Sequence, residues 1–283
     1  MTAVSVITGA AGAMGSKCAS AVSRDVDVVL LTDIDAERLA LAADEIQRST
    51  DAKVHTVVGD IAAPHVVDAL AARAAELGAL RALVQTAGLS PSMAGWRDIL
   101  NVDLVAVARA LDAFRPLVVR GSVAVCISSI SAHMGEFDPE LDAILDSPLA
   151  ADFIARFQAF ASVEPDPGAT YRLAKHAVLG LCERAAVTWG AAGGRVVSLS
   201  PGLIDTEMGR LELQHHAIKK WMAEITPTGA RTNDGNTVLP GRVDDIANAV
   251  AFVCSQRASF ISGCDLLVDG GLLAAMSHQE QHS

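Results

Sequence analysis

The chain has 283 residues, 51% of them hydrophobic and 19% charged, so it can bury a sizeable core in one large domain or two small ones. Its formal net charge of −11 argues against nucleic acid or an anionic membrane surface as the main partner, because both repel an acidic protein. The five cysteines are scattered without metal-type or redox-type spacing, and no basic leader or apolar run of about twenty residues is found, so we expect a cytoplasmic protein with reduced thiols.

Short, valine-rich apolar runs alternate with longer segments of helical periodicity along the whole chain. The predicted strands are Ala3–Thr8, Asp27–Thr32, Lys53–Val58, Ala82–Thr86, Ser122–Ser128, Arg195–Ser200 and Asp265–Val268. The predicted helices are Ala13–Arg24, Ala36–Ser49, Pro64–Leu77, Trp96–Val118, Thr170–Trp189 and Val243–Ser255. Because such alternation produces a parallel sheet covered by helices on both faces, it predicts a doubly wound α/β fold. No linker rich in Pro, Gly or Ser divides the chain, so we expect one domain over residues 1–276 and a polar tail over 277–283.

Two long segments interrupt this alternation. The first, residues 132–168, is an insertion before the helix that contains Tyr171, and its middle part, Ser147–Ser162, has apolar residues at helical spacing. The second, residues 207–240, has a tip rich in Gly, Asn and Asp at Thr228–Asn236, and we predict that it is an apolar, uncharged lid over the substrate. Ligands of open parallel sheets bind beyond the carboxyl ends of the strands, where both segments begin.

A glycine-rich turn, Thr8-Gly9-Ala10-Ala11-Gly12-Ala13-Met14-Gly15, joins the first predicted strand to the first predicted helix. Glycines in such a turn let backbone N–H groups approach a pyrophosphate at the helix N-terminus. Asp33 ends the second strand, where its carboxylate would accept hydrogen bonds from an adenosine ribose and repel a 2′-phosphate. No Arg or Lys occupies position 12 or 34, where such a phosphate would need one. These features predict a dinucleotide site that favours NAD over NADP.

Tyr171 is the only tyrosine of the chain, and Lys175 follows it by four positions in a predicted helix. Positions i and i+4 share one face of a helix, so the phenol and the ammonium can point into the same cleft. A phenol with a pKa of about 10 is a poor acid-base catalyst at neutral pH, and a neighbouring cation lowers that pKa. The pair therefore predicts a general acid-base group, with an amphipathic side chain beside a surface lysine as the alternative on this pattern alone.

Seven motifs in chain order resemble those of the short-chain dehydrogenase/reductase family, and the resemblance covers nearly the whole chain. They are Thr8–Gly15, Asp33, Asp60-Ile61, Ala87-Gly88, Ser129, Tyr171 with Lys175, and Pro201-Gly202. Asn101 matches the catalytic asparagine of the family, and the ending Val268-Asp269-Gly270-Gly271 is also typical of it. The resemblance implies a Rossmann-like sheet of about seven strands in the order 3-2-1-4-5-6-7.

The resemblance also implies an activity, the reversible transfer of a hydride between a nicotinamide and a secondary alcohol or ketone. It assigns catalysis to Asn101, Ser129, Tyr171 and Lys175. It assigns contacts with the cofactor to Gly9, Ala11, Gly12, Met14, Gly15, Asp33, Ile34, Asp60, Ile61, Ala87, Gly88, Tyr171, Lys175, Pro201, Gly202, Ile204 and Thr206. Tyr171 would exchange the proton with the substrate oxygen that Ser129 orients. Lys175 would also hold the nicotinamide ribose, and Asn101 would bind a water that links Lys175 to solvent.

Two departures from the family pattern concern the cofactor site. Ala13 stands where the middle glycine of the loop usually falls, and Gln85-Thr86 replaces the asparagines that usually precede Ala87-Gly88. The spacing of 42 positions from Ser129 to Tyr171 resembles that of the bacterial 3α-hydroxysteroid dehydrogenase/carbonyl reductase branch of the family. That branch implies a small hydrophobic substrate, a steroid-like or other carbonyl compound.

Members of the family usually assemble as dimers or tetramers, and the insertion at 132–168 lies beside the helix that often builds the tetramer, which favours a homodimer over a homotetramer here. One alternative function is a non-catalytic NAD-binding sensor or scaffold with the same fold. A methyltransferase that uses adenosylmethionine would not need Tyr171 and Lys175, and a nucleotide-sugar epimerase would usually need a larger substrate domain. We expect no metal site at His215-His216, because adjacent histidines point to different faces of a helix.

Overall fold

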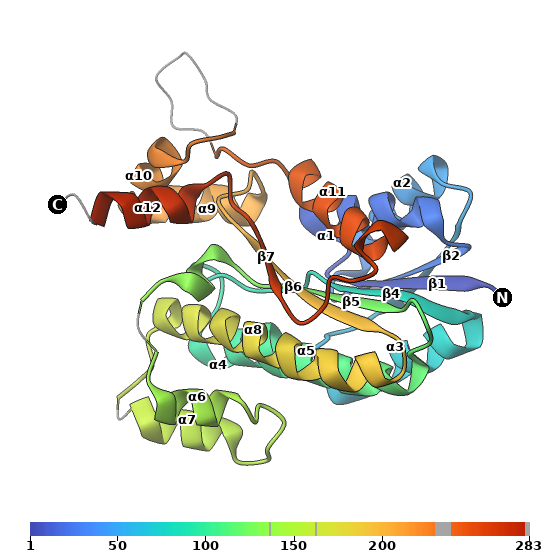
Figure 1. The fold of residues 1–283 in the computed structure, drawn as a ribbon, viewed down its shortest axis with the longest axis horizontal. Helices are drawn as coiled ribbons and strands as arrows, with labels where there is room; N and C mark the ends of the chain where they lie inside the picture. Colours follow the sequence, from blue (N-terminus) through green and yellow to red (C-terminus); the bar gives the residue numbers. More distant parts are fainter. Residues whose placement is uncertain (136, 162, 230–238, 281–283) are drawn as a thin grey trace.

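The computed structural model describes residues 1–135, 137–161, 163–229 and 239–280. At its centre is a sheet of seven parallel strands in the order β3-β2-β1-β4-β5-β6-β7 (Figure 1). The strands are β1 (Ala3–Thr8), β2 (Val28–Asp33), β3 (Lys53–Val58), β4 (Ala79–Gln85), β5 (Val123–Ile127), β6 (Arg195–Pro201) and β7 (Asp265–Val268). This order and direction confirm the predicted doubly wound fold.

Helices cover both faces of the sheet (Figure 1). One face carries α1 (Ala13–Val22), α2 (Ala36–Ser49) and α11 (Val243–Cys254). The other face carries α3 (Pro64–Leu77), α4 (Trp96–Leu100), α5 (Ala106–Phe114) and α8 (Pro167–Ala191). Successive residues of a strand point to opposite faces of the sheet. Leu30 of β2 therefore packs in the core beneath α3, α4, α5 and α8, whereas Val29 and Leu31 pack in the core beneath α1, α2 and α11. Strands buried on both faces read as continuous apolar runs, which is why they were recognisable in the sequence.

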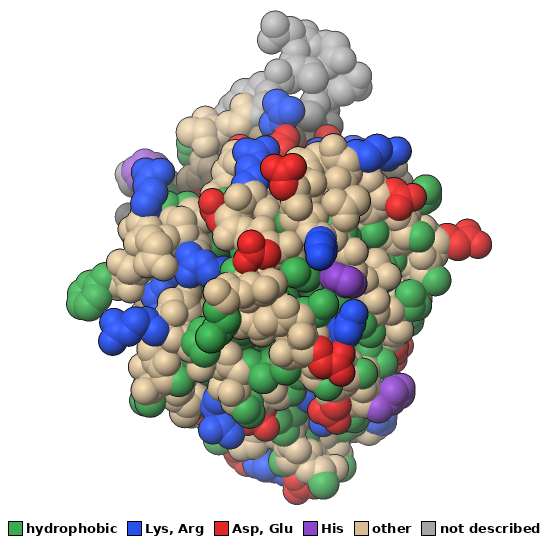
Figure 2. Space-filling view, turned by 90° about the vertical axis from the view of Figure 1, so that its right-hand side faces the viewer, with side chains coloured by type: hydrophobic (Ala, Val, Ile, Leu, Met, Phe, Trp, Pro, Cys, Tyr) green, Lys and Arg blue, Asp and Glu red, His purple; other side chains and the backbone are tan. Residues whose placement is uncertain are grey.

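Charged side chains of both signs are interspersed on the face shown in Figure 2, with hydrophobic side chains between them. Exposed ion pairs such as Arg73–Glu76, with 2.8 Å between nitrogen and oxygen, join charged side chains on the surface of the molecule. Such pairs typically contribute less than about 1 kcal/mol each to stability. The stability of the fold therefore depends mainly on the two apolar cores that flank the sheet.

The single helix predicted over Trp96–Val118 is interrupted. A π-turn at Asn101–Val105 divides it into α4 and α5, and the amide of Ala106 bonds back to the carbonyl of Asn101, five residues earlier. Such a turn inserts an extra residue into the helix and changes which side chains face inward. It places Asp103 in the protein interior, fully buried.

The insertion before the Tyr171 helix folds into α6 (Pro139–Leu145) and α7 (Phe153–Ala161), which lie beneath α8 in Figure 1. The helical stripe predicted at Ser147–Ser162 corresponds to α7, whereas α6 was not predicted; residues 136 and 162 lie outside the described part of the chain. Phe157 of α7 stacks on Trp96 of α4 with 5.9 Å between ring centroids, and Asp146 pairs with Arg184 of α8 at 2.6 Å. The insertion is therefore packed onto the body of the molecule.

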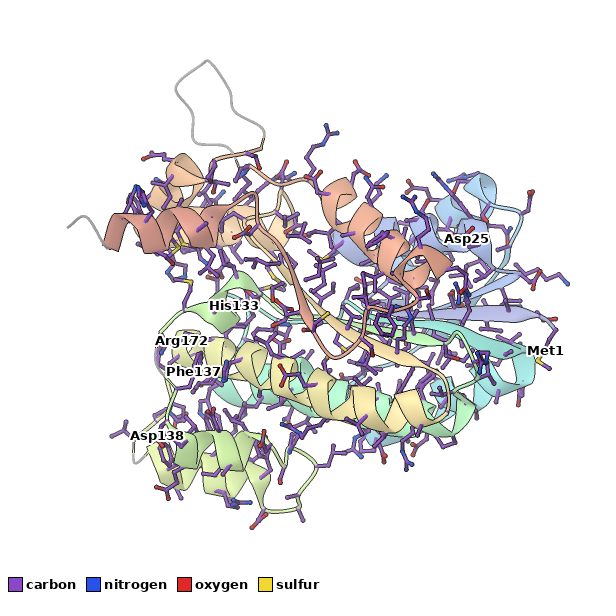
Figure 3. All side chains as sticks on the ribbon, in the orientation of Figure 1. Met1, Asp25, His133, Phe137, Asp138 and Arg172 are labelled. Carbon is purple, nitrogen blue, oxygen red and sulfur yellow. The ribbon has the colours of Figure 1, made fainter. Side chains whose placement is uncertain are left out.

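The N-terminal end of the insertion lies against α8. Phe137 and Arg172 are near one another in Figure 3, and the ring of Phe137 stacks on His176 of α8. His176 also lies 3.7 Å from Asp142 of α6. These contacts fasten the insertion to the same helix that contains Tyr171 and Lys175.

The segment 207–240 contains α9 (Glu207–His215) and α10 (Ala217–Ile225), and α12 (Leu272–Glu280) packs beside them (Figure 1). Met222 and Leu272 are buried there against Ile130, which follows β5. The predicted tip at Thr228–Asn236 falls mostly on residues 230–238, outside the described residues. The predicted polar tail begins inside α12, because residues 277–280 continue this helix. In the described part of the chain, every helix is too short or too polar to cross a lipid bilayer.

Candidate active site

The residues expected to contact a cofactor gather along one edge of the sheet. Because the strands are parallel, their carboxyl ends lie on the same edge, and the chain forms a binding crevice there in folds of this type. The glycine loop follows β1, Asp33 ends β2, Asp60 follows β3, Ala87-Gly88 follows β4, Ser129 follows β5, and Gly202 follows β6. Residues far apart in the sequence are therefore brought together by topology alone.

The glycine loop is pressed closely against the neighbouring strand end. Gly9 has a φ of +66°, and a Cβ on it would lie 2.6 Å from the amide nitrogen of Ala87. A Cβ on Gly15 would collide with the carbonyl oxygen of Gly9. Gly12 is the N-cap of α1 and has no side chain to accept from the first-turn amides, so these amides stay open to an anion such as a pyrophosphate. The presence of Ala13 in the loop does not disturb this arrangement.

Asp33 is tied to the glycine loop by its carboxylate. Its Oδ2 accepts a 2.9 Å hydrogen bond from the amide of Ala11, and its Oδ1 accepts one of 3.2 Å from Asp35. A carboxylate has about four lone-pair positions, so it retains acceptor capacity for ribose hydroxyls. Ile34 beside it is 68% exposed, which leaves its side chain free to cover an adenine ring.

The other expected contacts of the adenine half are less polar. Asp60 uses Oδ1 to accept from the amide of Ala62, and Ile61 is buried in the core. Thr86, which replaces a family asparagine, donates from its hydroxyl to the carbonyl of Thr8 at 2.6 Å. Gln85 lies close to the carbonyl of Val107 at 3.4 Å. The two substituted side chains thus take up contacts within the protein.

Ser129, Tyr171 and Lys175 converge beside this crevice. Nζ of Lys175 lies 5.6 Å from the centroid of the Tyr171 ring, and a side-chain hydrogen bond joins Tyr171 to Ser129. Ser129 also caps the 3₁₀ turn Ile130–His133, since its Oγ accepts from the amide of Ser131 at 3.2 Å. The lysine side chain is 5% exposed, and its Nζ donates to the carbonyl of Ile127 at 3.2 Å.

The pKa of Tyr171 is raised above its ordinary value of 10, whereas the sequence predicted that Lys175 would lower it. Burial of the phenol has the largest effect and raises the pKa, because the phenolate loses hydration. Lys175 and the hydrogen bond with Ser129 act in the expected direction, but the carboxylates of Asp103 and Glu212 oppose them. The prediction was wrong in its net direction because it considered only the helical neighbour.

Asp103, which was not among the predicted site residues, lies beside Lys175. Oδ2 of Asp103 lies 3.9 Å from Nζ of Lys175, and its Oδ1 accepts a 2.8 Å hydrogen bond from the amide of Leu89. We therefore add Asp103 to the candidate site. An acidic residue inside the apolar run Leu100–Val107 was a signal that could have identified it. Asn101 begins the π-turn that contains Asp103, and its role in binding a water that links Lys175 to solvent stays a prediction.

Close packing of the strand ends connects the glycine loop to this pair. A Cβ on Gly88 would lie 3.1 Å from Oδ1 of Asp103 and 3.5 Å from Nζ of Lys175. Its neighbour Ala87 touches Gly9, as described above. The backbone of Ala87 and Gly88, which follows β4, thus lies between the expected phosphate loop on one side and Lys175 on the other.

The expected contacts after β6 lie at the same edge of the sheet. Pro201 and Ile204 are buried, and a Cβ on Gly202 would lie 2.7 Å from Cα of Asp269. Thr206 is the N-cap of α9, with its hydroxyl accepting from the amide of Gly209 at 2.9 Å. Its hydroxyl hydrogen remains available for a second partner.

The segment over the site is charged, which corrects the prediction of an uncharged lid. Glu212 of α9 has a side chain only 14% exposed, and its Oε1 accepts from the amide of Ser92 at 3.3 Å. Its negative charge contributes to the raised pKa of Tyr171. Burial lowers the pKa of Lys219 on α10, and Glu212 partly offsets this effect. The prediction failed because the apolar content of this segment faces α12 instead.

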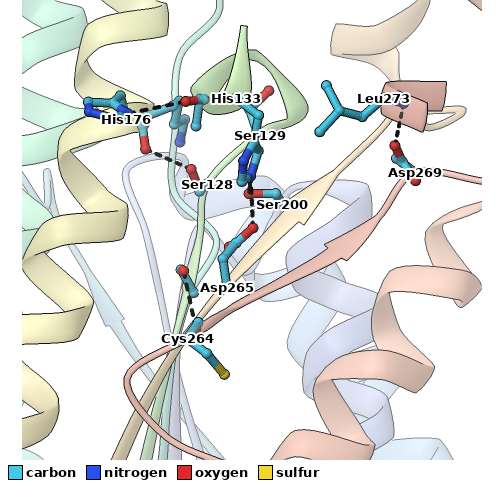
Figure 4. A network of polar contacts seen from close by, with 12 residues as sticks. Ser128, Ser129, His133, His176, Ser200, Cys264, Asp265, Asp269 and Leu273 are labelled. Atoms are coloured by element: carbon cyan, nitrogen blue, oxygen red, sulfur yellow. Dashed lines mark hydrogen bonds and ion pairs between the residues drawn. The ribbon is translucent and has the colours of Figure 1, made fainter. Parts of the chain in front are cut away.

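His133 is occupied by contacts with the sheet (Figure 4). Its Nε2 lies 2.9 Å from Oδ2 of Asp265 on β7 and 3.3 Å from Oγ of Ser200 on β6. This pairing fastens the turn that follows Ser129. Within the part of the chain that the structure describes, no cluster of His, Cys, Asp or Glu could hold a metal ion.

The geometry suits proton exchange beside a bound dinucleotide. A phenol supplies the proton, a serine hydroxyl can hydrogen-bond the same substrate oxygen, and an ammonium stabilises the phenolate. The tight glycine turn, the open N-terminus of α1 and the carboxylate of Asp33 fit the phosphates and the ribose of a nicotinamide dinucleotide.

Comparisons with known proteins agree with this geometry. Residues 3–138 match the family described as "short chain dehydrogenase", and residues 155–273 match the one described as "Enoyl-(Acyl carrier protein) reductase". The two matches leave out mainly part of the insertion and the C-terminal end.

Among curated proteins, the chain is similar to a cis-4-hydroxycyclohexanecarboxylate dehydrogenase of Sinomonas cyclohexanicum, at 29% identity over 96% of both chains. It is similar at 29% identity to a 3-alpha-hydroxysteroid dehydrogenase/carbonyl reductase of Comamonas testosteroni, over 69% of this chain and 73% of the relative. A solved 7α-hydroxysteroid dehydrogenase in complex with NADH and 7-oxo glycochenodeoxycholic acid has the same fold, with a TM-score of 0.73 at 24% identity, covering 95% of this chain and 93% of the other.

Proposed function

Because the chain belongs to the short-chain dehydrogenase/reductase family, we propose that it is an NAD-dependent oxidoreductase that interconverts a secondary alcohol and a ketone. The observation that carries this proposal is the convergence of Ser129, Tyr171 and Lys175 beside the glycine loop. The order of motifs and the fold support it. Proteins of this family act on small molecules, and relatives of the chain are named dehydrogenases and reductases.

The nicotinamide, when bound, supplies the hydride chemistry. During alcohol oxidation, Oη of Tyr171 accepts the proton of the substrate hydroxyl; during ketone reduction, it returns that proton to the carbonyl oxygen. Oγ of Ser129 hydrogen-bonds the substrate oxygen and orients it toward the phenol. Lys175 stabilises the negative charge on the phenolate and is held in place by the carbonyl of Ile127.

For the cofactor, we favour NAD over NADP. The Asp33 carboxylate lies against the glycine loop, where it would accept hydrogen bonds from ribose hydroxyls and repel a 2′-phosphate. The guanidinium of Arg38 on α2 pairs instead with the carboxylate of Glu207, with 3.4 Å between the charged atoms.

For the substrate, we propose a compact hydrophobic alcohol or ketone, such as a steroid or another cyclic compound. The buried cluster of Ile130, Met222 and Leu272 joins α10 and α12 to the turn that follows Ser129, so apolar packing lies next to the proposed site. The relatives named for a cyclohexane derivative and for a steroid support a ring-containing substrate. Glu212, which influences Tyr171 electrostatically, adds a charged group near the proposed site.

A screen of NAD and NADP with steroid, cyclohexyl and simple carbonyl compounds tests the activity through the change in NADH absorbance. We expect turnover with NAD and at least one cyclic substrate. For Tyr171→Phe, we expect kcat to fall by roughly a hundred- to ten-thousandfold, since acid-base help is worth that much. NADH titration of the same variant should be nearly normal, because the phenol oxygen is not needed to hold the dinucleotide.

The alternative, a non-catalytic NAD-binding sensor or scaffold, makes a different prediction. It requires that NADH bind while no carbonyl compound is reduced, with wild type and Tyr171→Phe indistinguishable. If Tyr171→Phe retained more than about half of the wild-type kcat, the acid-base role of the phenol would be rejected.

A further inference from the structure

Asp103 places a fully buried carboxylate at the inner end of the proposed site. It lies in the π-turn between α4 and α5, and its Oδ1 is fixed by the amide of Leu89 at 2.8 Å. Its Oδ2 has no hydrogen-bond partner among the described residues and lies 3.9 Å from Nζ of Lys175. A buried carboxylate oxygen without a partner is costly, so its retention at this position calls for a functional explanation.

The groups that face this carboxylate come from three other elements. Helix α8 contributes Lys175, whose ammonium attracts the carboxylate, and Tyr171, whose phenolate would be repelled by it. The loop after β4 contributes the amide of Leu89. Strand β5 contributes the carbonyl of Ile127, which shares Nζ of Lys175 with the carboxylate. Lys175 is thus the single cation that mediates between Asp103 and Tyr171 in this part of the described chain.

The charge of Asp103 changes close to neutral pH. Burial raises its pKa to about 6, while Lys175 and the hydrogen bond from Leu89 act in the opposite direction. Above that value the carboxylate is ionised and its charge opposes ionisation of the phenol. Below it, the neutral acid no longer competes for the ammonium.

We propose that Asp103 is a positioning residue that controls the proton exchange of Tyr171 through Lys175. In its ionised form, Asp103 is the counterion of the lysine and weakens the support that the ammonium gives to the phenolate. In its neutral form, it leaves that support undiminished. The proposal rests on the proposed function only in so far as Tyr171 is the group that exchanges the proton.

The direct test uses the fact that Tyr171 is the only tyrosine. Its ionisation can be followed by ultraviolet absorption of tyrosinate, without any substrate. In Asp103→Asn, an amide of the same shape can still accept from Leu89 but carries no charge. We expect the tyrosinate midpoint to fall by about one pH unit, because a repelling charge has been removed. A midpoint equal to that of wild type would overturn the proposal.

The matched control is Asp98→Asn, which removes the same charge from an exposed position on α4. We expect this variant to titrate like wild type. A shift of equal size in Asp98→Asn would also contradict the proposal, because it would attribute the effect to net charge instead of to the buried contact. Asp103→Ser, a second neutral variant with a smaller side chain, should shift the midpoint in the same direction as Asp103→Asn.

Two further measurements separate this proposal from the proposed function. If the enzyme turns over, the acid limb of kcat/KM for alcohol oxidation should move to lower pH in Asp103→Asn, since oxidation requires the phenolate. If no substrate is turned over by any variant, the proposed activity fails, and the tyrosinate titration still decides the role of Asp103.

The melting temperature gives a check that does not involve Tyr171. The pKa of Asp103 rises from 3.8 to about 6 on folding, so the native state holds this proton more tightly. The stabilisation from proton uptake is therefore fully present below the unfolded value and is lost as the pH rises through about 6. Relative to Asp103→Asn, the melting temperature of wild type should fall across this window. A difference between the two proteins that is independent of pH would contradict the assignment of this titration to Asp103.

Discussion

At the residue scale, the proposed site is a competition between opposite charges around one phenol. Lys175 favours the phenolate, whereas burial of the ring and the carboxylates of Asp103 and Glu212 disfavour it. Burial has the largest effect, so Tyr171 of the protein alone holds its proton more tightly than free tyrosine. The phenol is therefore in its protonated form at neutral pH, the form required for ketone reduction, whereas alcohol oxidation requires additional positive charge nearby to lower its pKa.

Asp33 allows a test of cofactor choice at the same scale. Asp33→Asn removes the charge but keeps an oxygen that can accept from the amide of Ala11. We expect the KM for NAD to rise about tenfold, because hydrogen bonds to a charged acceptor are worth more than neutral ones, and the KM for NADP to fall. Initial rates with both cofactors measure the change.

The control for this experiment is Asp35→Asn, two positions later in the same loop. Asp35 caps α2 by accepting from the amide of Arg38, and asparagine is an equally good cap. This variant should keep the wild-type cofactor preference. An unchanged NAD to NADP ratio in Asp33→Asn would show that the carboxylate does not contact the ribose.

At the element scale, α9 is joined to the loop after β4 by a small polar cluster. Oε1 of Glu212 accepts from the amide of Ser92 at 3.3 Å, and Oγ of Ser92 lies 3.3 Å from Nε2 of His216. Oε2 of Glu212 and the same histidine nitrogen are 3.5 Å apart. These contacts hold α9 against the loop that follows β4.

Removal of this connection should affect substrate binding more than cofactor binding. For Glu212→Ala, we expect KM for the substrate to rise several-fold, because the lost hydrogen bond is worth about 1 kcal/mol. The affinity for NADH should change little. Limited proteolysis should also cut within α9 and α10 faster, because the segment loses part of its anchoring. Gln214→Ala, an exposed change on the same helix, should have neither effect. Equal proteolysis rates for the two variants would show that the cluster does not hold α9 in place.

The elements differ in how well the sequence predicts them. The strands and most helices were predicted to within a few residues, because apolar periodicity and turn residues are local signals. The π-turn at Asn101–Val105 was missed, since a regular helix and an interrupted one have nearly the same apolar pattern. Asp103, which this turn buries next to Lys175, was therefore not among the predicted site residues. The choice of Ser129, Tyr171 and Lys175 did not depend on such detail, because they are placed by strand ends and helical spacing.

At the scale of the whole molecule, the insertion changes which surfaces are available for assembly. Helices α6 and α7 pack against α4 and α8, through Trp96 with Phe157 and Asp146 with Arg184. A partner chain that approached this face would meet the insertion first. Elsewhere, Phe260 between α11 and β7 is fully exposed, an unusual position for a large aromatic residue.

We expect the 29.4-kDa chain to form a homodimer in solution and propose that Phe260 lies in its interface. Phe260→Glu should then produce a monomer, because burying an unpaired carboxylate in the interface between two chains is unfavourable. Light scattering coupled to gel filtration measures the mass. Val163→Glu, an exposed change in the insertion, should leave the dimer intact.

Two outcomes would contradict this arrangement. A tetramer in the wild type would show that the insertion does not block further assembly. A dimer that survives Phe260→Glu would show that another surface joins the two chains. Neither result would affect the proposed chemistry, because Ser129, Tyr171 and Lys175 all belong to one chain.

The contacts between β5 and α8 have a mechanical consequence. Oγ of Ser128 donates to the main-chain carbonyl of Lys175 at 2.7 Å, and Nζ of Lys175 donates to the main-chain carbonyl of Ile127 at 3.2 Å (Figure 4 shows the first). This reciprocal pair clamps the strand to the helix without using any residue of α9 or α10. The mutual spacing of the reacting groups therefore does not depend on the conformation of α9 and α10. Substitutions in α9 and α10 could therefore change which compounds bind while the spacing of Ser129, Tyr171 and Lys175 stays the same.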